Sequence, residues 1–206
     1  MRAGLSLLAA TLLAGCATTS VAKNPQDEFF ASLSARCGKA YAGRLASDQE
    51  ADAEMRDKAM VLHIRHCTDD RIEIPFHIDG LAQDGGWDRS RTWIITRTPA
   101  GLRLKHDHRH ADGSPDAITL YGGDSKPPGT AERQQFPADG ESVAMFRRAD
   151  MLASTHNTWA MEIEPDQRFV YELTRPEERR FRVEFDLSKP VALPPAPWGD
   201  QASPAP

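Results

Sequence analysis

The feature that most constrains the fold is a one-for-one alternation of apolar and charged side chains in several short segments of this chain. It is clearest in residues 180–187, which read RFRVEFDL. In an extended strand, side chains two residues apart share a face, so one face of this segment would be apolar and the other charged. The pattern predicts a half-buried strand of an antiparallel sheet.

The same period recurs along the chain, with turn-forming residues between the segments. Pro75 lies in one segment and predicts an edge strand or a bulge there, because proline has no N–H for the hydrogen bonds of the sheet. Residues 139–154 fit either a short helix or another strand. The predicted strands are 40–47, 59–67, 71–79, 91–98, 102–110, 117–121, 158–164, 168–174 and 180–187.

One helix is predicted before the strands. Asp27 would be its N-cap, apolar residues follow at helical spacing from Phe29 to Cys37, and Gly38 would end it. Eight to ten antiparallel strands, each with one apolar face, would close into a barrel or a two-sheet sandwich. We therefore expect a mainly β fold with a single domain at residues 27–190, followed by a proline-rich, disordered tail at residues 191–206.

The charge and hydropathy of the chain narrow the class of protein. Lys and Arg number 25 against 30 Asp and Glu, which gives a formal net charge of -5. A protein that binds nucleic acid by covering phosphates would be basic, so no nucleic-acid partner is expected. A mean hydropathy of -0.53 excludes a protein with several membrane-spanning helices.

The first residues, MRAGLSLLAATLLAGC, place an apolar stretch after Arg2 and end in small residues and Cys16. The stretch is too short to span a bilayer and fits a secretory signal peptide. Its end, Leu-Ala-Gly-Cys, resembles the lipobox of bacterial lipoproteins. The resemblance implies a signal peptide at residues 1–15, lipidation with palmitate at Cys16 and a flexible tether at residues 16–26. An ordinary signal peptide with a chance cysteine is the alternative.

That resemblance also implies a location in the cell. In lipobox proteins an aspartate after the lipidated cysteine often means retention at the inner membrane, whereas Ala17 stands there in this chain. The resemblance therefore implies an anchor in the bacterial outer membrane, with the folded domain facing the periplasm. The membrane would be a partner through the lipid anchor, since several acyl chains tether a protein firmly.

The order of a helix, then GKAYAG at residues 38–43, then a meander of strands resembles calycin-like β-barrels. Tyr41 stands where the signature of that family has its tryptophan. The stretch from Trp87 to Gly123 is similar to a group of uncharacterised secreted bacterial proteins. These resemblances imply a calycin-like barrel and no particular reaction.

Two cysteines remain beside Cys16, namely Cys37 and Cys67. Two cysteines in an oxidising envelope most simply pair. We expect a disulfide between the end of the helix and the end of strand 59–67, with Cα atoms within about 7 Å. Two separate buried thiols are the alternative.

The most unusual segment is HDHRH at residues 106–110, in which His106, His108 and His110 share one face of a strand. This row continues from Leu102 and Leu104, whereas the other face is charged. Burying ionised groups costs several kcal/mol each, so the histidines should follow the leucines into the interior. His106 should then be the most buried of the three and His110 the most exposed.

Three functions remain open. In the first, the barrel binds a small apolar or amphipathic ligand, with Trp93, His106, His108 and Tyr121 as candidate contacts. This first function needs no cofactor. In the second, the chain is a metal-dependent enzyme or a metal-binding protein in which His106 and His108 hold Zn or Cu. Ligands from elsewhere would be required, and His63, His66, His77 and His156 are the other histidines. In the third, the chain is a structural or interaction protein of the envelope. The sequence identifies no catalytic residue for any of the three.

Overall fold

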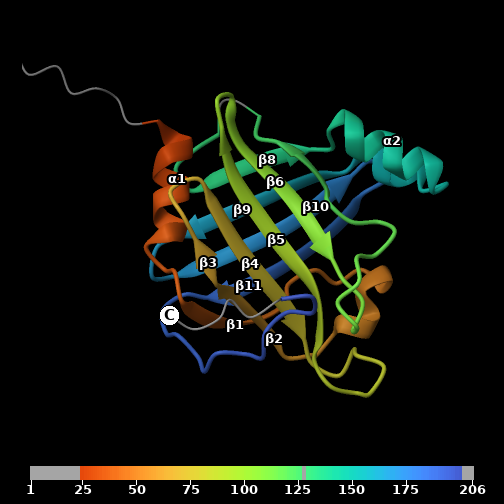
Figure 1. Ribbon diagram of the computed structural model, residues 1–206, viewed down its shortest axis with the longest axis horizontal. Coiled ribbons are helices and arrows are strands. Elements are labelled where there is room, and N and C mark those ends of the chain that lie inside the picture. Colours follow the sequence, from red (N-terminus) through yellow and green to blue (C-terminus); the bar gives the residue numbers. More distant parts are fainter. Residues whose placement is uncertain (1–23, 127–128, 201–206) are drawn as a thin grey trace, which may run out of the picture.

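The computed structural model describes residues 24–126 and 129–200. They form one antiparallel sheet of eleven strands, curled into a nearly closed barrel (Figure 1). The strand order is β7-β6-β5-β4-β2-β1-β11-β10-β9-β8, and β3 pairs with β4. The predicted mainly β barrel with one helix before the strands is therefore confirmed, as one sheet rather than two.

The helical elements are α1 (Pro25–Ser34), α2 (Gly140–Arg148) and two 3-10 helices, η1 (Glu50–Met55) and η2 (Leu152–His156). The strands are β1 (Lys39–Leu45), β2 (Met60–Ile64), β3 (His66–Cys67), β4 (Arg71–Ile78), β5 (Asp88–Thr98), β6 (Gly101–His108), β7 (Tyr121–Asp124), β8 (Arg133–Pro137), β9 (Thr158–Glu164), β10 (Arg168–Arg175) and β11 (Arg179–Asp186). Among the described residues, no helix is long and apolar enough to cross a membrane.

The two ends of the sheet, β7 and β8, meet at a seam that nearly closes the barrel. The amide of Asp139 donates to the carbonyl of Gly122 at 2.9 Å, and the amide of Lys126 donates to the carbonyl of Gln135 at 2.9 Å. A Cβ on Gly123 would lie 1.8 Å from the carbonyl oxygen of Pro137. Only glycine allows the two backbones to approach so closely.

Helix α1 covers one end of the barrel. Its Phe29, Phe30 and Leu33 are fully buried, and Figure 1 shows it at the opposite end of the barrel from α2. The predicted N-cap is wrong: Asn24 accepts a hydrogen bond from the Gln26 amide, and Pro25 takes the first helical position that suits proline. Asp27 lies inside the helix.

The structure decides between two pairs of alternatives that the sequence left open, and it corrects one predicted strand. Pro75 lies in β4, which has neighbours on both sides, and the register of β4 with β5 shifts between Phe76 and Ile78, so the strand is irregular as a bulge predicts and is not an edge. Residues 117–120 are not a strand, because Asp116 caps the Ile118 amide in a turn and Leu120 has a positive φ. Of the two alternatives for residues 139–154, the short helix is confirmed as α2, whereas β8 was not predicted at all.

The Cys37–Cys67 disulfide is present, with Cα atoms 6.2 Å apart, and it ties the chain after α1 to β3. Residues 191–200 differ from the expected disordered tail because they lie against the barrel: the Trp198 amide donates to the Arg89 carbonyl, and Arg65 pairs with Asp200 at 2.5 Å. The signal peptide, Cys16, most of the tether and residues 201–206 lie outside the described residues.

Candidate functional site

A cavity of about 430 Å³ lies at the end of the barrel opposite α1. The strand ends that form it come from β4, β5, β6, β7, β9, β10 and β11, and residues of α2, η1 and η2 complete its rim. Much of its wall is aromatic: Phe76, Trp93, Tyr121, Phe146, Trp159, Tyr171 and Phe181. Phe146 comes from α2 and the others come from six separate strands, so the folded barrel is needed to bring them together.

Several of the aromatic rings stack on one another. Trp93 lies between Phe76, at a centroid distance of 5.0 Å, and Tyr171, at 4.3 Å. On the other side of the cavity Tyr121 stacks on His106 at 4.7 Å and lies 5.6 Å from Trp159. The packed rings give the cavity a broad, rigid apolar surface.

The prediction that the leucines and histidines of β6 face the interior of the barrel is confirmed. Leu102, Leu104 and His106 are buried, His108 is half-buried and His110 is exposed. His106 is 2% exposed and is the most buried of the three histidines. The charged residues of β6 face outward, where Arg103 pairs with Asp124.

Both ring nitrogens of His106 are hydrogen-bonded. Nδ1 lies 3.1 Å from the carbonyl oxygen of Tyr121 and Nε2 lies 2.7 Å from the hydroxyl of Tyr171. A carbonyl oxygen only accepts, so Nδ1 carries the proton and Tyr171 donates to Nε2. Burial lowers the pKa of His106 to about 3, with His108 contributing. The ring is therefore neutral at ordinary pH.

His108 is linked to the same cluster through Tyr121, whose hydroxyl lies 2.9 Å from its Nε2. Burial, followed by the charge of Arg91, lowers the pKa of His108 to about 4. Burial raises the pKa of Tyr121 to about 12 and that of Tyr171 well above 10. All four groups are neutral at pH 7, so they offer hydrogen bonds rather than charge.

The histidines do not converge as a metal site would require. Both nitrogens of His106 are already engaged, and His63, His66, His77 and His156 do not line this cavity. Within residues 24–126 and 129–200 no group of three His, Cys, Asp or Glu side chains could hold a metal ion.

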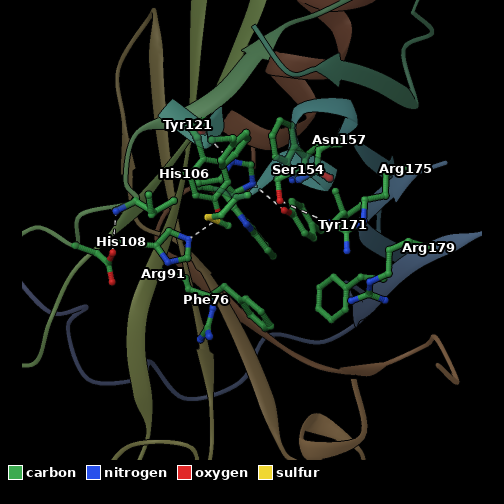
Figure 2. Close-up of a pocket in the computed structure, with 18 of the residues that line it drawn as sticks. Phe76, Arg91, His106, His108, Tyr121, Ser154, Asn157, Tyr171, Arg175 and Arg179 are labelled. Carbon is green, nitrogen blue, oxygen red and sulfur yellow. Dashed lines mark hydrogen bonds between the residues drawn. The ribbon is translucent and has the colours of Figure 1, made fainter. Parts of the chain in front are cut away.

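Three arginines on the cavity wall were not predicted from the sequence. Figure 2 shows Arg91 and His108 on one side, Arg175 and Arg179 on the other, and Tyr171 between them. Arg91 pairs with Asp88 at 2.5 Å, and Arg179 pairs with Asp52 of η1 at 2.5 Å. Arg175 has no carboxylate partner in the part of the chain that the structure describes.

Two buried polar residues lie beside Arg175 on the same side of the cavity (Figure 2). Ser154 of η2 has its hydroxyl 3.5 Å from Nη1 of Arg175. Asn157 follows η2 and lines the cavity, and its Oδ1 is buried with no hydrogen-bond partner among the described residues.

Searches against family models, curated proteins and solved structures find no match for this chain. What the structure itself establishes is a β-barrel with an aromatic cavity at one end, an arrangement compatible with ligand binding. Trp93, His106, His108 and Tyr121, the residues singled out from the sequence, all line that cavity.

Proposed function

We propose that this chain is a lipoprotein of the bacterial envelope whose barrel binds a small amphipathic ligand. The observation that carries the proposal is the aromatic cavity, which has polar side chains gathered at its rim. Ligand sites combine mostly apolar walls with a few placed polar groups, and their volumes run from about 300 to 1,000 Å³. The cavity is at the small end of that range.

The lipobox-like leader supplies the location in this proposal. A lipidated Cys16 would hold the barrel at the outer membrane, facing the periplasm, where a disulfide such as Cys37–Cys67 persists. A lipid-tethered barrel could then take up an amphiphile close to the membrane. Neither a catalytic group nor a metal is needed for this function.

Native mass spectrometry of the chain from residue 16 onward tests the proposal. The protein would carry Cys16→Ser and be exported behind a conventional cleavable leader, so that it is released without lipid. We expect a co-purified small molecule, or uptake of added 1-decanol as an apolar probe.

The matched variants are Leu173→Trp, which fills the cavity, and Leu193→Trp, which adds the same bulk to an exposed position of the C-terminal segment. The first should lose the bound molecule and the second should retain it. If the Cys16→Ser protein carries no small molecule and takes up no decanol, the proposal is overturned. Equal binding by the two variants would overturn it as well.

A further inference from the structure

The charges around the cavity are unevenly balanced. The ion pairs with Asp88 and Asp52 neutralise Arg91 and Arg179. Arg175 is half-buried at the end of β10, and among the described residues its guanidinium has a hydrogen bond only with the Ser154 hydroxyl. One guanidinium charge therefore faces the cavity without a compensating carboxylate among the described residues.

Asn157 provides a second, independent observation at the same place. Its side chain is 7% exposed, and its Oδ1 has no partner among the described residues. Leaving a buried amide without a hydrogen bond is unfavourable, and the two amide atoms exchange places when the side chain is flipped. A carboxylate cannot donate to Oδ1, but in the flipped amide Nδ2 takes that position and would donate to a carboxylate oxygen beside Arg175.

The opposite side of the cavity does not suit an anion. Arg91 is already paired with Asp88 there, and Asp116 adds a further carboxylate whose charge acts on His108. An anionic head group would meet net negative charge on that side and an unpaired cation on the Arg175 side (Figure 2).

From these observations we infer that the cavity selects amphiphiles with a carboxylate head group, held by Arg175 together with Ser154 and Asn157. The apolar part of the ligand lies against Trp93 and Tyr171. A single unpaired guanidinium matches one negative charge, and its fork of donors fits the two oxygens of a carboxylate. The inference rests on the proposed function, since it names the ligand class for the same cavity.

Calorimetric titration of the Cys16→Ser chain with decanoate, 1-decanol and decyl phosphate, all below their micellar concentrations, tests the inference. We expect decanoate to bind about tenfold or more tightly than decanol, because hydrogen bonds between charged groups are stronger than those between neutral groups. Arg175→Gln should reduce the decanoate affinity to that of decanol and leave decanol binding unchanged. Arg175→Lys should retain part of the preference.

The matched control is Arg44→Gln, which removes the same charge from an arginine on the outer wall that is 77% exposed. It should leave both affinities unchanged. If decanol and decanoate bind equally well and Arg175→Gln alters neither, the carboxylate inference is overturned while the binding function stands. If decyl phosphate binds more tightly than decanoate and this binding depends on Arg175, the head group that the cavity selects is a phosphate and not a carboxylate. If no probe binds, the proposed function itself fails.

Discussion

The Tyr171 hydroxyl lies 2.7 Å from Nε2 of His106, although the two residues are 65 positions apart in the sequence. They come from β10 and β6, and their contact crosses the interior of the barrel. Because the other nitrogen of His106 is held by the Tyr121 carbonyl, the polar atoms of this cluster satisfy one another. A ligand would therefore meet mostly ring surfaces at this part of the cavity.

Replacing Tyr171 by phenylalanine removes the donor to His106 and leaves a buried ring nitrogen unpaired. We expect Tyr171→Phe to lower the free energy of unfolding by about 1–3 kcal/mol, measured by urea denaturation. Tyr41→Phe is the matched control, since Tyr41 is also buried but its hydroxyl makes no hydrogen bond among the described residues. Equal losses in the two variants would contradict the assigned contact.

The stability of the fold should fall in mild acid. The pKa of His106 is about 3 and those of His77 and His108 are about 4, all lowered chiefly by burial. In the unfolded chain these histidines take up protons near pH 6.5, whereas in the folded chain they stay neutral until near pH 4. Stability is therefore full above about pH 7 and declines as the pH falls toward 4.

His77 allows this pH dependence to be dissected. It is fully buried on β4, neither ring nitrogen has a hydrogen-bond partner among the described residues, and the charge of Arg89 adds to the lowering of its pKa. We expect His77→Leu to flatten the dependence of the urea midpoint on pH between 4 and 7, whereas replacing the exposed His110 by leucine should not. An unchanged slope in His77→Leu would count against the assignment.

The seam of the barrel should tolerate no side chain at Gly123. Gly123→Ala would place a methyl group within 1.8 Å of the Pro137 carbonyl oxygen, which is backbone and cannot move aside without parting β7 from β8. We expect a loss of roughly 1–3 kcal/mol or more in the free energy of unfolding. Gly140→Ala, at a position with open space around it, should have little effect or a stabilising one. Equal thermal midpoints for the two variants would argue against the close approach.

Alternation of side chains was sufficient to predict most of the strands and the inward direction of His106. The same reasoning applied to β10 would have placed Arg175 at the barrel mouth, because Phe169, Tyr171 and Leu173 precede it at two-residue steps on the inward face. Arg179 precedes Phe181 in the same way. The inward row of a barrel strand reaches the rim, so the arginines that end these rows lie in the cavity wall.

Other features of the fold and of the site could not be predicted, because they depend on contacts between segments that are far apart in the sequence. β8 carries few apolar residues, and Gln134 is fully buried there with its amide donating to the Thr130 carbonyl. The meeting of Ser154, Asn157 and Arg175 depends on where η2 lies against the end of β10. No spacing in the sequence encodes that placement.

The disulfide should contribute strongly to stability. Cys37 and Cys67 close a loop of 30 residues, for which chain entropy predicts about 3–4 kcal/mol. The double variant with alanine at both positions should lose about that amount in urea denaturation. Thiol counting on the unfolded, unreduced mature protein should find no free cysteine, and two free thiols would contradict the pairing.

The lipid anchor is tested by Cys16→Ser in the full-length chain. Lipidation requires the cysteine thiol, so the variant should neither incorporate labelled fatty acid nor be cleaved by the lipoprotein route, and its precursor should accumulate. Cys37→Ser is the matched control, because it removes a thiol from the folded domain and leaves the leader intact. The control should label with fatty acid and fractionate with the outer membrane. If Cys16→Ser also labels and fractionates in this way, residues 1–16 are not a lipoprotein leader and the proposed envelope anchor is wrong.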